Sequence, residues 1–96
     1  MKANLRFYSK DFHEGRYIVE LSVHDVGVSE KYPDGVKYGL ICFDQETEEF
    51  VLFDNHHPKG PHIHIDGKEL SYEYVDDESL LNDFATAVFE KFGVRI

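Results

Sequence analysis

Alternation of apolar and polar side chains within residues 16–26 limits the possible folds of this chain more than any other feature of the sequence. Four apolar side chains would share one face of an extended strand: Tyr17, Val19, Leu21 and Val23. The opposite face would carry Glu20, Ser22 and His24. A helix would scatter both sets around its axis, so the pattern predicts a half-buried β-strand. Such a strand needs paired neighbours and a second layer over its apolar face.

The rest of the chain up to residue 75 has the character of further strands separated by turns. By apolar content and alternation we expect these strands at residues 4–8, 36–44, 50–55, 61–65 and 70–75. Turn residues lie between them, as in Pro33-Asp34-Gly35 and Asp66-Gly67. Short connections pair neighbouring strands antiparallel, which predicts a meander of five or six strands.

The last segment changes from strand to helical periodicity. Its apolar residues recur at intervals typical of one helix face: Leu80, Leu81, Phe84, Val88 and Phe92. Asp76 or Asp77 is expected to cap the start of this helix, and Gly93 to end it. We therefore predict a single α+β domain over residues 1–96, with one C-terminal helix packed on one face of the sheet.

Composition narrows the cellular setting. No apolar run approaches the ~18–20 residues of a membrane span, and the N-terminal residues lack a hydrophobic signal core, so we expect a soluble, cytoplasmic protein. Cys42 is the single cysteine, lies in a predicted strand, and is expected to be buried. The formal net charge of −9 disfavours unaided binding to nucleic acid, which relies on lysine and arginine.

The charge is unevenly distributed. Residues 44–54 and 69–78 each hold five carboxylates and no lysine or arginine, whereas residues 55–68 carry +1 from Lys59 and Lys68 against Asp66. Four histidines lie in this less acidic island: His56, His57, His62 and His64. The island is therefore the most reactive stretch of the sequence.

Strand geometry predicts how these histidines are arranged. His62 and His64 would share one face of their strand while Ile63 and Ile65 face the core, with Ser71 and Glu73 on the matching face of the next strand. The short return over residues 58–61 would bring His56 and His57 back toward them. Four imidazoles are thus expected to converge at one end of the sheet.

Three interpretations of this cluster remain open. In the first, the histidines are solvated and without function. In the second, a divalent transition metal such as zinc is bound by His56, His62 and His64, with Asp54 or Asp66. In the third, a histidine pair performs general acid–base chemistry, and Lys59 or Lys68 stabilises an anion. The spacing of the histidines matches no closed structural zinc motif. Phosphodiester cleavage in RNA needs a base for the 2′-hydroxyl and an acid for the leaving oxygen, which suits the third interpretation.

Four short motifs occur in a characteristic order over residues 17–92. They are residues 34–40 (DGVKYGL), residues 53–57 (FDNHH), residues 62–64 (HIH) and residues 80–84 (LLNDF). In this order they resemble the TumE-like family of bacterial and archaeal toxin–antitoxin proteins. The positions that match the family pattern are Asp54, Asn55, His57, His62 and His64.

The resemblance implies a small intracellular toxin that an antitoxin with a helix-turn-helix domain holds inactive. It supplies no catalytic mechanism. With the histidine chemistry above, it leads us to expect a ribonuclease that uses Asp54, Asn55, His57, Lys59, His62 and His64. The acidic charge makes a ribosome or a basic partner the expected source of affinity for RNA. Self-association is a further expectation, because one helix covers only one face of the sheet. The alternative is a non-catalytic metal-binding or protein-interaction module.

Overall fold

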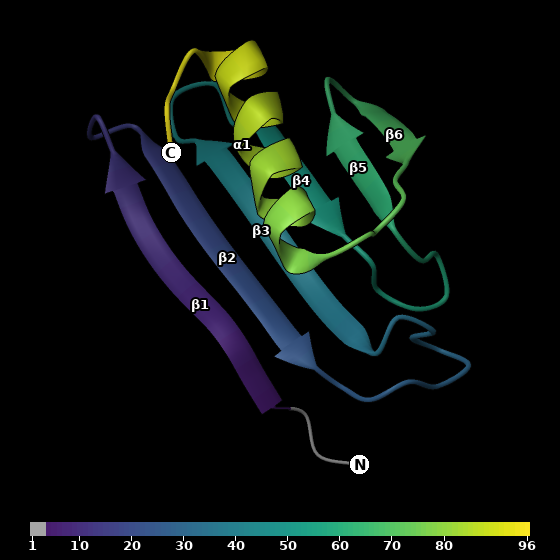
Figure 1. Ribbon diagram of the computed structural model, residues 1–96. Helices are drawn as coiled ribbons and strands as arrows, with labels where there is room; N and C mark the ends of the chain where they lie inside the picture. Colours follow the sequence, from purple (N-terminus) through teal and green to yellow (C-terminus); the bar gives the residue numbers. More distant parts are fainter. Residues whose placement is uncertain (1–3) are drawn as a thin grey trace.

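The strands predicted from alternation assemble into one six-stranded antiparallel sheet in the computed structural model, which describes residues 4–96 (Figure 1). The elements in chain order are β1 (Asn4–His13), β2 (Tyr17–Asp25), β3 (Val36–Asp44), β4 (Phe50–Asp54), β5 (His62–Ile65), β6 (Lys68–Ser71) and α1 (Asp77–Phe92). Spatial order follows chain order from β1 to β6, so each strand pairs with its neighbour in sequence. The predicted α+β meander with a single C-terminal helix is confirmed.

One face of the sheet is covered by α1, which lies over β3 and β4 (Figure 1). The core forms between them because alternation sends every second strand residue toward the helix. The side chains of Leu80, Phe84 and Val88 are buried on α1, and the ring of Phe84 meets that of Phe53 edge-on, with 5.5 Å between centroids. Cys42 is buried in this core, as predicted.

The ends of α1 are set by the residues expected from the sequence. The carboxylate of Asp76 accepts a hydrogen bond of 2.7 Å from the backbone N–H of Ser79, which caps the first turn. At the other end, Gly93 adopts a left-handed conformation with φ of 72°, and its N–H donates to the carbonyl of Phe89 at 2.8 Å.

The predicted bounds of two strands are wrong by more than one residue. β1 runs ten residues to His13 rather than ending at Tyr8. Its side chains are mostly exposed on both faces, so it lacks the burial pattern by which a strand is recognised, and it is held by its pairing with β2. β6 spans Lys68–Ser71 rather than residues 70–75.

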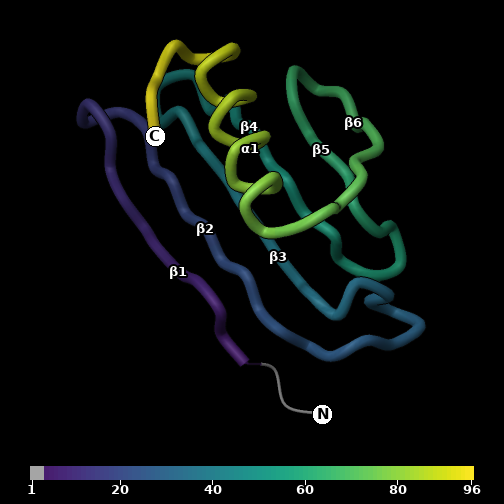
Figure 2. The backbone as a smooth tube through the Cα atoms, in the orientation of Figure 1, coloured from purple at the N-terminus to yellow at the C-terminus, as the bar shows by residue number. Residues whose placement is uncertain are grey.

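The chain leaves the sheet after Ser71 because two tyrosines tie it to the helix. The hydroxyl of Tyr72 donates to Asp83 at 2.7 Å, and that of Tyr74 donates to Asp77 at 2.6 Å. The ring of Tyr72 packs against Phe53, which anchors the crossing in the core. Figure 2 shows this segment passing from β6 to the start of α1.

The exposed charged turn after β3, residues 45–49, is held by Asp44, the last residue of that strand. The carboxylate of Asp44 is buried and accepts two hydrogen bonds of 2.8 Å from Arg16. It also accepts from the N–H of Glu46 and the hydroxyl of Thr47. The Arg16 guanidinium holds the pKa of Asp44 well below its usual range. This group ties the β1–β2 turn to the β3–β4 turn.

The second face of the sheet, opposite α1, is called the open face below. It carries the strand residues that alternate with the buried ones. Cross-strand pairing arranges one of its rows as Ser22, Gly39, Asp54, His62 and Ser71, and the next as Glu20, Ile41, Leu52, His64 and Glu69. Among the residues that the structure describes, no helix has the length and apolar composition needed to cross a membrane.

Candidate functional site

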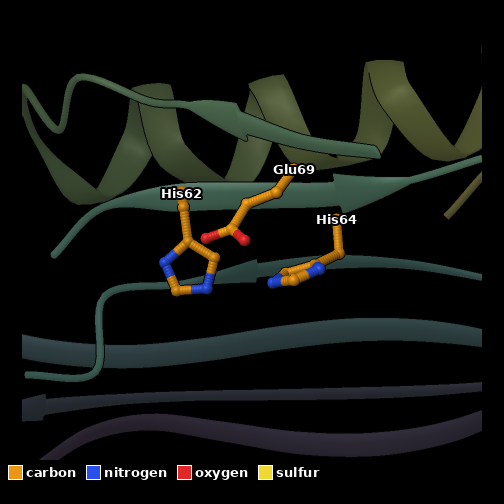
Figure 3. Close-up of side chains that lie close together, drawn as sticks. All are labelled: His62, His64 and Glu69. Atoms are coloured by element: carbon orange, nitrogen blue, oxygen red, sulfur yellow. The ribbon is translucent and has the colours of Figure 1, made fainter. Parts of the chain in front are cut away.

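The two histidines of β5 lie side by side on the open face (Figure 3). Ile63 and Ile65 pack against the core, so the alternation of β5 turns His62 and His64 to the opposite side. Their ring centroids are 4.9 Å apart, with the planes nearly perpendicular. The predicted register and the shared face of His62 and His64 are confirmed.

A carboxylate from β6 completes this group. Glu69 pairs directly with His64 across the β5–β6 hairpin, and Figure 3 shows its carboxylate close to both rings. One potential ligand atom from each of His62, His64 and Glu69 lies within 4.8 Å of the other two. We call these three residues the His–Glu group.

The third member of the group differs from the sequence prediction. Ser71 does pair with His62, but Glu73 lies beyond the end of β6, so Glu69 is the nearby carboxylate. The two-residue turn at Asp66-Gly67, which the sequence predicts, sets the register of this hairpin. It pairs Ile65 with Lys68 and therefore His64 with Glu69.

The loop before β5 orients the ring of His62. The Nδ1 atom of His62 lies 2.6 Å from the carbonyl oxygen of Gly60, which can only accept a hydrogen bond. Nδ1 must therefore carry the proton, and in the neutral ring Nε2 holds the lone pair. His62 is only 7% exposed, so this orientation is well constrained. A lone pair at Nε2 can accept a proton or bind a metal.

The charge of the group is set by Glu69 and its neighbours. Lys59 donates a hydrogen bond of 3.0 Å to Glu69, and this contact lowers the pKa of the carboxyl, with smaller contributions from His64 and His62. Glu69 is thus ionised at neutral pH and can stabilise a proton on either imidazole. Lys59, predicted as an anion-stabilising residue, lies at the edge of the same site.

Asn55 has a structural arrangement rather than one suited to chemistry. Its side chain is buried, with Oδ1 accepting from the N–H of Tyr38 at 2.9 Å and Nδ2 donating to the carbonyl of Val36 at 2.8 Å. Both partners are backbone groups of β3 just beyond the last β3–β4 pair, Gly39 with Asp54. The amide of Asn55 therefore continues the ladder where β4 has ended.

The other predicted residues separate from the His–Glu group. His56 and His57 are exposed in the β4–β5 loop; the N–H of His56 donates to Asp54 at 2.5 Å, and that of His57 donates to the hydroxyl of Tyr32 at 3.3 Å. Within residues 4–96, neither belongs to the group of potential metal ligands, so Glu69 takes the place predicted for His56. Asp66 pairs with Lys91, and within residues 4–96 it is not one of the three close potential ligands.

Asp54 connects the His–Glu group to a second feature of the open face. Asp54 is the cross-strand partner of His62, and it also lines a hollow of about 390 Å³ over β2, β3 and β4. His24, Lys37 and His56 line this hollow as well. Alternation alone placed His24 on a polar face, but the pairing of His24 with Lys37 depends on the β2–β3 register.

The arrangement suits two kinds of chemistry. Two imidazoles beside a lysine and a carboxylate can exchange protons with one bound substrate. Two imidazoles and one carboxylate can also hold a divalent transition metal and leave positions open for other ligands. Comparison of the chain with protein-family models, curated proteins and solved structures found no match.

Proposed function

We propose that this chain is the toxin of a toxin–antitoxin pair and that it cleaves RNA in the cytoplasm with His62 and His64. One observation carries the chemistry: Nδ1 of His62 donates a hydrogen bond to the carbonyl of Gly60, which leaves Nε2 as a proton acceptor beside a second imidazole. The ring centroids of His62 and His64 are 4.9 Å apart. The ordered motifs that resemble the TumE-like family support the biological role. They include His62, His64 and Asp54.

The proposed reaction divides the work between the two rings. Nε2 of His62 takes the proton of the ribose 2′-hydroxyl, and the 2′-oxygen attacks the phosphorus. The bond from phosphorus to the 5′-oxygen breaks, and protonated His64, stabilised by Glu69, donates its proton to that oxygen. The products are a 2′,3′-cyclic phosphate and a 5′-hydroxyl end. Lys59 stabilises the charge on the non-bridging phosphate oxygens.

Single and double substitutions test this division. His62→Ala and His64→Ala should each reduce RNA cleavage by about 10²–10⁴-fold, the usual contribution of a general acid or base, and should relieve growth arrest on expression. His13→Ala, at the end of β1, is the matched control and should remain active. A double variant that still arrests growth and cleaves RNA at the original rate would contradict the proposal.

We propose that the inhibitory partner is an antitoxin with a helix-turn-helix domain. The formal charge of −9 favours a partner with a basic surface. Co-expression with the neighbouring reading frame should restore growth and yield a complex on co-purification. If growth is not restored and sedimentation shows only monomers of this chain, the partner is not encoded there and self-association is also absent.

A metal site is the second candidate function, and the three close ligand atoms of His62, His64 and Glu69 favour it. The tautomer of His62 supports it too, because metal-binding histidines commonly donate their second ring N–H to a carbonyl. Zinc would use Nε2 of His62, a nitrogen of His64 and an oxygen of Glu69. Open positions would then make it a catalytic rather than a closed structural site.

Calorimetry with zinc separates the two candidates. If the metal site exists, zinc should bind more tightly than millimolar and raise the melting temperature, since binding to the native state alone stabilises it. Glu69→Gln should weaken this binding, whereas Glu73→Gln, an exposed residue outside the group, should not. Affinity should fall as pH falls, because protons compete for the imidazole nitrogens. RNA cleavage that survives exhaustive chelation would support the metal-free mechanism.

A further inference from the structure

The hollow beside the His–Glu group lies over Gly39, a residue without a side chain. Gly39 lies on the open face between Ser22 and Asp54 in the cross-strand row. A Cβ atom at residue 39 would have the hydroxyl oxygen of Ser22 as its nearest neighbour, at 3.9 Å. The space above Gly39 is therefore not filled by adjacent side chains. Its volume of about 390 Å³ lies in the range of small-ligand sites and exceeds what a bare ion needs.

The walls of the hollow favour an anionic group. Lys37, His24 and His56 come from β3, β2 and the β4–β5 loop, and all three can donate hydrogen bonds. Within residues 4–96, Lys37 has no carboxylate within 4.0 Å of its ammonium group. Among the described residues of the lining, Asp54 is the one carboxylate, and it accepts a hydrogen bond from the backbone N–H of His56 at 2.5 Å. Lys37 is thus free to meet an anion in a chain that is otherwise acidic.

The position of the hollow links it to the reaction site. Asp54 lines the hollow and pairs with His62, so the two features share an edge. β3 and β5 are separated only by β4, which places Gly39 about 10 Å from His62 across the sheet. A single RNA strand crossing the open face would therefore pass from the His–Glu group into the hollow.

We propose that the hollow above Gly39 is a nucleotide subsite, in which Lys37, His24 and His56 bind a phosphate of the RNA strand next to the scissile one. The substrate class rests on the proposed ribonuclease function, but the binding is measurable without cleavage. Ser22 adds a hydroxyl at the floor of the subsite. This device gives an acidic protein a local source of affinity for RNA.

Binding of a fluorescein-labelled uridine hexamer to the His62→Ala/His64→Ala double variant tests the subsite. Adding Lys37→Gln should weaken binding by about tenfold or more, as expected for the loss of a hydrogen bond to a charged group. Adding Gly39→Leu should weaken it similarly by filling the hollow. Lys10→Gln, on exposed β1 outside the hollow, is the matched control and should change little. Each variant is checked for an unchanged melting temperature; if Gly39→Leu fails to fold, Lys37→Gln decides the result.

Three outcomes would overturn the subsite: no binding of the hexamer at millimolar protein, binding unaffected by Lys37→Gln, or inorganic phosphate binding as tightly as the hexamer. The last would mean a site for free phosphate. Failure of the ribonuclease proposal gives a different result, because the wild-type chain would then not cleave RNA while Lys37→Gln would still weaken hexamer binding. Cleavage by the wild type with hexamer binding indifferent to Lys37 would instead reject the subsite alone.

Discussion

Replacement of Asn55 tests whether this residue supports the fold, as its contacts indicate, or the chemistry, as its place in the sequence motif suggested. Asn55→Ala removes the bond that Nδ2 donates to Val36 and the bond that Oδ1 accepts from Tyr38, at 2.8 and 2.9 Å. The backbone groups of Val36 and Tyr38 belong to buried residues, so each loses its hydrogen bond to Asn55 without gaining free access to water.

The expected loss of stability in Asn55→Ala follows from the two backbone groups that are left without a hydrogen-bond partner. Each buried group left without a partner costs about 1–3 kcal/mol, so the free energy of unfolding should fall by about 2–4 kcal/mol if water relieves part of the loss. In a domain of this size that lowers the melting temperature by about 10–30 °C. Urea titration followed by circular dichroism measures the change, and His57→Ala, at the exposed loop position two residues further on, should stay within about 0.5 kcal/mol of wild type.

Asn55→Asp adds a test that depends on pH. The aspartate keeps an acceptor for Tyr38, but its second oxygen faces the carbonyl of Val36, so burial and this contact should raise its pKa in the folded state. The variant should be most stable below the unfolded aspartate pKa of about 3.9 and should lose stability relative to wild type as pH rises above it. Wild-type stability in Asn55→Ala, or no pH dependence in Asn55→Asp, would refute the structural role.

Three further predictions concern the core and its polar anchor. Phe84→Ala should lower the free energy of unfolding by about 3–5 kcal/mol in urea titration, because Phe84 is only 1% exposed. Phe89→Ala, at a position 42% exposed on the same helix, should cost about 1 kcal/mol or less. Equal costs for the two variants would mean that α1 packs by another face. Burial raises the pKa of the Cys42 thiol to about 11, so Ellman's reagent at pH 8 should react at least about 100-fold more slowly with the folded than with the urea-unfolded protein. Arg16 lowers the pKa of Asp44, so the stability that this pair contributes is present above the unfolded carboxyl pKa of about 3.9 and is lost as pH falls through the folded value. The Asp44→Asn variant should therefore be less stable than wild type at pH 7, and its stability should fall less steeply in acid. Parallel acid profiles of the two proteins would refute this.

Residues close together in the chain account for most of what could be predicted. The alternation of β2 and β3, the cap at Asp76 and the stop at Gly93 depend on local geometry, and each is present in the structure. The shared face of His62 and His64 follows in the same way from the two-residue period of a strand.

Predictions that needed a partner distant in the chain were less successful. The length of β1 could not be predicted from periodicity, because its side chains show no alternating burial and its pairing with β2 holds it in place. The sequence predicts Asn55 as a site residue and Asp44 only as the end of a strand, since it does not reveal which polar groups a fold will bury. Both bury polar atoms against backbone or arginine partners about 17–28 residues away.

The sequence by itself therefore determined the kinds of element, their order and the side of β5 on which the histidines lie. Tertiary structure decided what those histidines meet. Glu69 completes the His–Glu group, and Lys37 with His24 lines a hollow over Gly39, because strand register places them there. Periodicity depends on a few covalently linked residues, whereas a site depends on neighbours that only the hydrogen-bonded pairing of separate strands brings together.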